Sequence, residues 1–366
     1  MKLHIFNPEH DMALAANLER FTAPHAGREM RADLGFLPAL WADNGDLVLV
    51  DDVEAAQEAV RHVRKFAHDV VFVTTRDLKA LARDFSDVEV EPWGWDRSLK
   101  GQLLRAADSM RMFLPDDARL DRIRTMSSRR FAADNLLPVL RDCGISDMVG
   151  ESVYCQSADE VNAALAVYAG GVLKSPWSSS GRGVRYVRTS ALDGHSAGWV
   201  GNVLRQQGGI MVEPIYPKVY DFGMEFYAGE YGIDYCGLSL FDTRSGAYTG
   251  SVCATENDKL QMMSRFFTAE RLFDVSSTII NILEPLMEGT YTGPFGVDMM
   301  VVAAFGGGFM LHPCVELNLR RTMGHVALAV SPNEYEPRRI MSVYYADKYR
   351  IRIQNLTDNL INTGLC

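Results

Sequence analysis

Short, mainly apolar runs alternate with amphipathic segments over the first 122 residues, and this alternation most constrains the fold. Leu3–Phe6, Leu47–Val50 and Val70–Val73 are apolar runs of strand length, and Val53–Phe66 carries apolar residues at helical spacing. Strands without regular polar alternation are buried on both faces, as in a parallel sheet covered by helices. We therefore predict an α/β domain with a parallel sheet over residues 1–122.

Beyond residue 122 the expected strands are longer and glycine is frequent. The predicted strands are 171–175, 183–188, 210–213, 218–228, 232–241, 293–302 and 309–317, and the predicted long helices are 194–206 and 268–287. This pattern of long strands and few helices is typical of an α+β body built mainly from antiparallel sheet. We expect this body to span residues 123–330, with residues 331–366 forming a C-terminal tail packed on it.

The charge balance and the cysteines limit the classes of function. The chain has 37 Lys and Arg against 47 Asp and Glu, a net charge of −10, which disfavours nucleic acid and anionic membranes as partners. No stretch reaches the 18 apolar residues of a membrane span, and the first 15 residues do not form a signal peptide. Six scattered cysteines without a CxxC pair are typical of reduced thiols, so we predict a cytoplasmic protein.

A loop rich in serine and glycine follows a predicted strand that ends in a lysine, in the segment KSPWSSSGRGVRYV from Lys174 to Val187. Small residues let backbone N–H groups approach anionic oxygens, and Lys174, Arg182 and Arg185 add positive charge. The pattern is neither a Walker loop nor a dinucleotide-binding GxGxxG. A phosphate cradle and a plain polar hairpin are both open at this point.

A second polar segment, VELNLRRTMG, begins at Val315 after an apolar run. Because strand side chains alternate, we expect Glu316, Asn318 and Arg320 to share one face. Glu and Asn offer the oxygen ligands that magnesium prefers, and an arginine can stabilise developing negative charge. Asp298, in GVDMMV, adds a carboxylate among apolar strand residues. A face of structural salt bridges is the alternative.

Taken together and in this order, the segments resemble the ATP-grasp superfamily, especially its biotin carboxylase and D-alanine ligase types. The strand lysine and its loop, MVEPI at 211–215, GVDMMV at 296–301 and ELNLR at 316–320 look like the family's phosphate loop, adenine hinge and two metal-binding strands. The resemblance covers residues 123–330. It implies an ATP-grasp fold of two largely antiparallel subdomains, a nucleotide-clasping one at 123–212 and a metal-binding one at 213–330.

The resemblance also implies roles for individual residues. Lys174 would hold the α- or β-phosphate of ATP, and Glu213 and Ile215 would lie at the adenine hinge. The loop that would close over the triphosphate comprises Ser178, Ser179, Ser180, Gly181, Arg182 and Gly183. Asp298, Glu316 and Asn318 would bind Mg²⁺ or Mn²⁺, and Arg320 would face the reacting acyl group. An earlier lysine is usual in the family, and the sequence SSRRF offers Arg129 or Arg130 in its place, without deciding between them.

Polar residues also follow the first predicted strand, in Asn7-Pro8-Glu9-His10-Asp11. Open parallel sheets bind ligands at the carboxyl ends of their strands, so Glu9, His10 and Asp11 are candidate substrate contacts, with an ammonium group as the feature recognised. Arg321 is a further candidate. The alternative is a helix start, with Asn7 as N-cap and Pro8 at the first helical position.

The function implied by the resemblance is an ATP-dependent, ADP-forming carboxylate–amine ligase. ATP would phosphorylate a small-molecule carboxylate, and an amine would attack the acyl phosphate. The alternatives are an ATP-binding regulator without turnover and a phosphotransferase on the same scaffold. The sequence does not identify the acid or the amine, and it leaves monomer and homodimer open.

Overall fold

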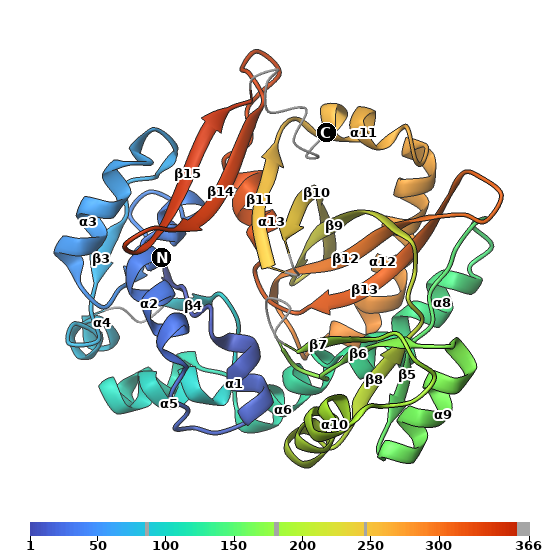
Figure 1. The fold of residues 1–366 in the computed structure, drawn as a ribbon. Coiled ribbons are helices and arrows are strands. Elements are labelled where there is room, and N and C mark those ends of the chain that lie inside the picture. The colour runs from blue at the N-terminus through green and yellow to red at the C-terminus, as the bar shows by residue number, and fades with distance from the viewer. Residues whose placement is uncertain (85–87, 179–182, 245–246, 357–366) are drawn as a thin grey trace. The chain divides into compact units, whose positions relative to one another are not determined.

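The computed structural model describes residues 1–84, 88–178, 183–244 and 247–356 (Figure 1). The chain divides into two compact units that interleave along the sequence. Unit 1 contains residues 1–123, 249–255 and the described residues from 320 onward, and unit 2 contains residues 124–248 and 256–319. The domain limits at 122–123 and 330–331 remain predictions.

Unit 1 contains the predicted parallel sheet. Its strands are β1 (Lys2–Ile5), β2 (Leu47–Leu49), β3 (Val71–Val73) and β4 (Glu89–Pro92), in the spatial order β3-β2-β1-β4. All three pairings are parallel, with Leu3 of β1 opposite both Leu47 and Val90. These apolar side chains are buried in the core of the unit, which confirms the α/β prediction.

Helices and short helical turns lie between these strands and after β4. They are α1 (His10–Ala16), α2 (His25–Leu34), η1 (Leu37–Leu40), α3 (Val53–Arg61), η2 (Arg64–Phe66), α4 (Leu78–Asp84), α5 (Arg97–Ala106), η3 (Asp108–Phe113) and α6 (Asp117–Met126). Side-chain caps fix two of the helix starts, because Asp52 and Asp96 accept the N–H groups of Ala55 and Leu99.

Three strands that the sequence did not predict lie wholly or mainly in unit 1. β14 (Arg339–Tyr345) pairs antiparallel with β15 (Tyr349–Asn355) and with β11 (Ala247–Cys253), after the short helix α13 (Met323–Ala329). β11 is separated from β14 by 85 residues of sequence, and nothing local marks that pairing.

Unit 2 contains two antiparallel sheets. The smaller has the order β5-β8-β6-β7, from β5 (Val153–Cys155), β6 (Gly171–Lys174), β7 (Val184–Val187) and β8 (Ile210–Glu213). Helices α9 (Ala158–Tyr168) and α10 (Gly194–Gln207) cover one of its faces. The apolar side chains of that face are Leu173, Ile210 and Val212, so the neighbouring residues Lys174 and Glu213 point to the opposite face.

The larger sheet of unit 2 carries the long strands. They are β9 (Lys218–Gly229), β10 (Gly232–Arg244), β12 (Gly293–Ala303) and β13 (Phe309–Asn318), in the order β13-β12-β9-β10. The helices beside them are α11 (Glu256–Met263) and α12 (Ala269–Met287). All the strands and the two long helices predicted between 171 and 317 are present, which confirms the antiparallel α+β body.

The helical stretch after Ser127 is not one regular helix. It consists of α7 (Arg129–Phe131), a π-helical turn η4 (Ala132–Leu136) and α8 (Leu137–Asp142), and Gly144 ends it with φ +88°. Pro138 has no N–H for the helical ladder, and the π turn lies directly before it. No helix in the described parts of the chain is long and apolar enough to cross a membrane.

Candidate functional site

Lys174 and Glu213 form a buried ion pair on the inner face of the small sheet. The Lys174 Nζ lies 2.5 Å from Glu213 Oε2, and both residues are less than a tenth exposed. They are diagonal neighbours on β6 and β8, since Lys174 is opposite Met211 and Val172 is opposite Glu213. The Ser152 hydroxyl donates to the second oxygen of Glu213 at 3.1 Å. The strand lysine and the proposed hinge are therefore in direct contact.

The serine-rich loop is closed at its base and anchored at its start. The Ser175 N–H donates to the Gly183 carbonyl at 2.8 Å, and a Cβ on Gly183 would collide with the Ser178 side chain. Trp177 is held by two hydrogen bonds between its backbone and the Gln207 side chain, of 3.0 and 3.2 Å. Four of the predicted loop residues, Ser179, Ser180, Gly181 and Arg182, lie outside the described residues.

Arg129 and Arg130 have different environments. Arg129 is buried, and its guanidinium donates to the Ser175 carbonyl and the Ser178 hydroxyl, both at 2.7 Å, and to the Glu316 carboxylate at 2.8 Å. Arg130 is half exposed, packs over the Tyr154 ring and pairs with Asp134. The structure therefore brings Arg129 together with the loop and with β13, and leaves Arg130 on the surface.

The predicted metal ligands lie on one face of the large sheet. Asp298 of β12 is directly opposite Glu316 of β13, and Asn318 is opposite Gly296. Glu225 of β9 is also opposite Gly296 and is 2% exposed, so it adds a fourth oxygen-bearing side chain to this face. Glu225 could not be assigned to this face from the sequence, because the cross-strand register cannot be read from one strand.

Two carboxylates directly opposite each other repel, and a cation between them removes the repulsion. No cluster of three or more His, Cys, Asp and Glu side chains arranged to hold a metal occurs among the described residues. The Asp298, Glu316 and Asn318 set is of another kind, with two carboxylates and an amide. Magnesium is commonly held by one or two carboxylates together with substrate phosphates, so these residues fit it.

His312, which the sequence did not mark, is buried beside the ion pair of Lys174 and Glu213. It is 1% exposed, and neither ring nitrogen has a hydrogen-bond partner in the described chain. Burial lowers the pKa of His312 to about 4, and Lys174 adds to the effect while Glu213 opposes it. The ring meets Tyr216 edge-on, with centroids 5.5 Å apart. His312 is therefore neutral at pH 7.

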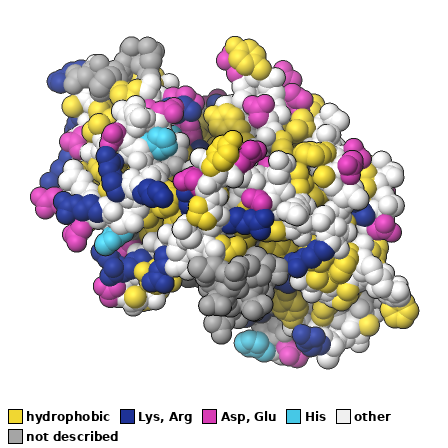
Figure 2. All heavy atoms as spheres, turned by 90° about the horizontal axis from the view of Figure 1, so that it is seen from above, with side chains coloured by type: hydrophobic (Ala, Val, Ile, Leu, Met, Phe, Trp, Pro, Cys, Tyr) yellow, Lys and Arg dark blue, Asp and Glu magenta, His cyan; other side chains and the backbone are white. Residues whose placement is uncertain are grey.

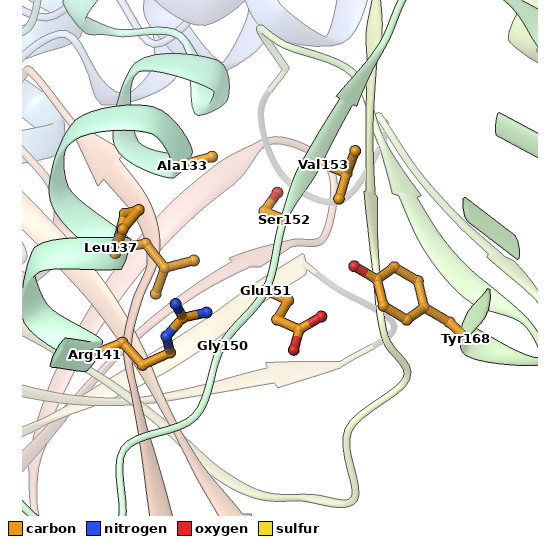
Figure 3. Close-up of a pocket in the computed structure, with 9 residues that line it drawn as sticks. Ala133, Leu137, Arg141, Gly150, Glu151, Ser152, Val153 and Tyr168 are labelled. Carbon is orange, nitrogen blue, oxygen red and sulfur yellow. The ribbon is translucent and has the colours of Figure 1, made fainter. Parts of the chain in front are cut away.

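A pocket of about 220 Å³ lies behind Ser152, between α8 and the segment that leads into β5 (Figure 3). Arg141, Glu151 and Tyr168 are among its lining residues. Burial, together with a hydrogen bond to the Glu151 carboxylate, raises the pKa of Tyr168 to about 12, so this hydroxyl stays protonated. Ser152 links the pocket to the ion pair, because its hydroxyl donates to Glu213.

In unit 1, the segment after β1 contacts the segment after β4. The alternative interpretation of Asn7 as the N-cap of α1 is wrong. The Asn7 side chain instead donates to the Gly94 carbonyl at 2.9 Å and to Asp96 at 3.3 Å, and the N-cap position is occupied by Glu9 without a side-chain cap bond. The His10 Nδ1 lies 3.0 Å from Asp96 Oδ2. The Asn7 side-chain oxygen, which would accept a cap bond, instead accepts the Gly94 N–H at 3.3 Å.

The arginines that follow β13 also lie in unit 1. We expected Arg320 to share a strand face with Glu316. It does not, because β13 ends at Asn318. The Arg320 guanidinium forms a fork with the Asp11 carboxylate, with distances of 3.0–3.2 Å. Arg321 pairs with Glu91 and packs over the Trp41 ring, while its N–H donates to the Trp93 carbonyl.

The surface drawn in Figure 2 shows Lys and Arg side chains interspersed with Asp and Glu rather than gathered into a basic stripe. This distribution agrees with the net charge of −10.

Comparisons with known proteins agree on the fold. No model of a protein family matches the sequence, and no curated protein sequence matches it. Among solved structures, the biotin carboxylase domain of 2-oxoglutarate carboxylase from Hydrogenobacter thermophilus matches with a TM-score of 0.52 and 13% identity, over 93% of this chain and 74% of that chain. Biotin carboxylase from Campylobacter jejuni matches with a TM-score of 0.51 and 12% identity, over 93% and 75%.

The chain has the ATP-grasp fold. A further match, a putative ATP-grasp superfamily protein from Archaeoglobus fulgidus, covers 98% of this chain and 100% of that one with a TM-score of 0.45 and 12% identity. Identities this low show the ATP-grasp fold alone, so the function is argued below from the residues of this chain.

Proposed function

We propose that this protein is an ATP-dependent, ADP-forming ligase that activates a small-molecule carboxylate as an acyl phosphate for attack by an amine. The observation that carries the proposal is the assembly of two buried cations and an oxygen-rich sheet face in unit 2. Arg129 touches both the loop and Glu316, and Lys174 pairs with Glu213 at the end of β8. In support, the two biotin carboxylase structures of the same fold contain MgADP or an ATP analogue.

The residues of unit 2 divide the work of binding ATP. Lys174 is proposed to hold the α- or β-phosphate, and the loop from Ser178 to Gly183 to cover the triphosphate. Arg129 is proposed as the second cation that binds the phosphates, in place of the family's earlier lysine. It is buried beside the loop, whereas Arg130 is on the surface. Glu213 and Ile215 stay proposed at the adenine hinge.

Asp298, Glu316 and Asn318 are the residues proposed to hold Mg²⁺, or Mn²⁺, at the large sheet. A bound divalent ion would supply positive charge that stabilises the transferring phosphoryl group. Arg129, which contacts Glu316 at 2.8 Å, lies beside these ligands and brings its own positive charge to the same place.

The reaction joins two anions, and the protein must first overcome their repulsion. A carboxylate oxygen attacks the γ-phosphorus of ATP, and the bond to the β-phosphate oxygen breaks to release ADP. The amine lone pair then forms a bond to the acyl carbon, and the bond from that carbon to the phosphate oxygen breaks. Lys174 and Arg129 neutralise the anions, and exclusion of water protects the acyl phosphate from hydrolysis. Arg320 stays proposed to stabilise charge on the reacting acyl group.

The cellular compartment is proposed from the cysteines, and the oligomeric state from the fold. The five cysteines in the described chain are all free, which is typical of a reducing compartment such as the cytoplasm. A homodimer is proposed because the Hydrogenobacter thermophilus biotin carboxylase domain of the same fold was crystallised as a dimer.

A binding experiment tests the nucleotide assignment. Mg·ATP at about 100 times its dissociation constant should stabilise the protein by about 2.7 kcal/mol through mass action. Lys174→Met should lose this stabilisation, whereas Lys218→Met, which removes an exposed lysine, should keep it. No response of the wild type to millimolar Mg·ATP would refute the proposal.

A product analysis separates the ligase from its alternatives. Carboxylates are screened with Mg·ATP and hydroxylamine, which traps an acyl phosphate as a hydroxamate. A ligase gives ADP, phosphate and hydroxamate in equal amounts. A phosphotransferase leaves the phosphate on its acceptor without hydroxamate, and a regulator stabilised by ATP shows no turnover with any carboxylate.

A further inference from the structure

The pocket of about 220 Å³ behind Ser152 has no part in the proposed reaction, and all its lining residues belong to unit 2 (Figure 3). One wall is the helical stretch of η4 and α8, which contributes Ala133, Leu137 and Arg141. The other wall is the chain segment 150–153, at the start of β5. Pockets for drug-sized ligands have about 300–1,000 Å³, so this one suits a smaller molecule.

Arg141 presents unused hydrogen-bond donors to this pocket. Its guanidinium pairs with Asp142 along one edge, with Nε at 3.1 Å and Nη2 at 3.5 Å from the carboxylate oxygens. No described residue accepts from Nη1, and Figure 3 shows the guanidinium directed from α8 toward segment 150–153. The hydrogen bond to Asp142 raises the pKa of Arg141, so the group is positively charged. Its free end suits the paired oxygens of a carboxylate.

The acidic side chain of the pocket already has a donor. The Tyr168 hydroxyl donates to the Glu151 carboxylate, and burial together with this bond raises the pKa of Tyr168 to about 12, which keeps the hydroxyl protonated. A ligand amine would compete with Tyr168 for Glu151, whereas a ligand carboxylate takes donors of Arg141 that no described residue uses. Leu137 and Val153 offer apolar surface for the rest of the ligand.

Both walls of the pocket lead to residues proposed to bind ATP. The helical stretch of η4 and α8 continues directly from α7, which begins at Arg129. On the other wall, the Ser152 hydroxyl donates to Glu213 at 3.1 Å. A backbone hydrogen bond also joins Glu151 to the hydroxyl of Tyr216, one residue beyond the proposed hinge. A ligand that contacts both walls therefore touches the elements that position the proposed phosphate cation and the adenine hinge.

The two walls are in close contact at Gly150. Its φ is +142°, and a Cβ there would lie 2.8 Å from Leu137 Cδ1, so no other residue fits between the walls. Closely packed groups transmit displacements to one another. A ligand that fixes one wall beside Gly150 therefore also restrains the other.

We propose that this pocket is a regulatory site for a small carboxylic acid with an apolar body. The ligand carboxylate pairs with the free end of the Arg141 guanidinium, and the body packs between Leu137 and Val153. By bridging the walls, the ligand holds the elements around Arg129 and Glu213 in one arrangement, which favours nucleotide binding. The regulatory role rests on the proposed binding of ATP, whereas the carboxylate site itself does not.

The first test measures carboxylate binding to the full chain without nucleotide. Sodium benzoate is the probe, and its dissociation constant is obtained from ligand-observed NMR titrations. Benzamide, which has the same shape without the charge, and benzylammonium, which has the opposite charge, are the controls. A ligand this small should bind in about the millimolar range.

We expect benzoate to bind saturably, and both control ligands to bind at least tenfold more weakly. Arg141→Gln should weaken benzoate binding at least tenfold, while Arg205→Gln, at an exposed arginine of α10, should leave it unchanged. Because Arg141 is not among the residues proposed for the reaction, its effect assigns the binding to this pocket rather than to a substrate site. No saturable binding, equal binding of a control ligand, or unaltered binding in Arg141→Gln overturns the proposal. The ligand comparison decides even if that variant fails to fold.

The second test measures the coupling. Saturating benzoate should lower the dissociation constant of Mg·ATP at least about fivefold, and saturating Mg·ATP should lower that of benzoate by the same factor. In Arg141→Gln the same concentration of benzoate should leave Mg·ATP binding unchanged. An unchanged or higher constant in the wild type overturns the regulatory role. If Mg·ATP does not bind at all, the proposed function and the regulatory role fail together, while the benzoate titration still decides the carboxylate site.

Discussion

The ion pair between Lys174 and Glu213 offers a sharp test of the site, because the two charges depend on each other inside the protein. The Nζ to Oε2 distance is 2.5 Å, and the two side chains are only 11% and 9% exposed. Removing one partner of a buried pair leaves the other charge desolvated without compensation. Glu213→Gln keeps an acceptor for the Ser152 hydroxyl but replaces the carboxylate that faces the ammonium.

The expected magnitude follows from that burial. Glu213→Gln should lower the free energy of unfolding by about 3–5 kcal/mol, and Lys174→Met by a similar amount, because each leaves one buried charge. The double variant should lose less than the sum, with a coupling of roughly 0.5–3 kcal/mol, since it leaves neither charge uncompensated. The pair of Lys218 and Asp221 provides the control, because it has the same 2.5 Å distance but its side chains are 45% and 20% exposed. Breaking it should cost about 1 kcal/mol or less.

The assay is urea unfolding of the nucleotide-free protein, with each variant compared at the midpoint and with the slope checked for constancy. If Glu213→Gln costs no more than Asp221→Asn, burial does not govern this pair. The reasoning that places a desolvated lysine at the head of the loop would then be wrong.

Three further perturbations probe other parts of the structure. The pKa of His312 is lowered from 6.5 to about 4, so between these pH values the unfolded state binds more protons than the folded state. The free energy of unfolding should therefore fall by roughly 3 kcal/mol as the pH drops through this window. In His312→Phe this part of the pH dependence of unfolding should vanish. In thermal unfolding, Gly94→Ala should destabilise the protein by about 1–3 kcal/mol, because the new Cβ would lie 2.5–2.6 Å from the His10 ring. Gly198→Ala, on α10 with no atom within 4 Å of the new Cβ, should stabilise it by roughly 0.5–1 kcal/mol. Glu316→Gln should lower turnover far more than ATP affinity in steady-state kinetics and ATP titration, and equal losses would contradict its assignment to phosphoryl transfer.

The elements that local patterning predicted are those whose burial follows from their own residues. The runs at Leu47–Val50 and Val70–Val73 are apolar throughout, and both form parallel strands, although in β3 only Val73 is buried and Val71 is 52% exposed. The long strands between 218 and 317 were found because alternation and turn glycines mark their limits. β14 and β15 were missed because MSVYY and RIRIQN lack a turn signal strong enough to distinguish a hairpin from irregular structure.

The candidate site residues were proposed from the sequence, but their pairings could not be. Lys174 and the Glu-x-Asn strand were identified from local sequence and the family resemblance. The partner of Lys174 is 39 residues away, and Asp11 and Arg320 are separated by 309 positions, distances at which a single sequence carries no pairing signal. His312 also carried no signal, because a buried histidine and a surface histidine look alike in a strand pattern. Only the fold shows that His312 is buried and that its pKa is therefore lowered.

We proposed Arg129 as the additional phosphate cation of the site, and its contacts suit a guanidinium. One planar group donates to the Ser175 carbonyl, the Ser178 hydroxyl and the Glu316 carboxylate, each within 2.8 Å. An ammonium carries its three donors on a single atom and binds as a point charge, so it could not span the loop and the large sheet in the same way. Because one side chain contacts both elements, a phosphate that drew Arg129 toward the loop would also alter its contact with Glu316. If the proposed site binds ATP, we therefore expect nucleotide binding to be coupled to the proposed metal ligand through Arg129.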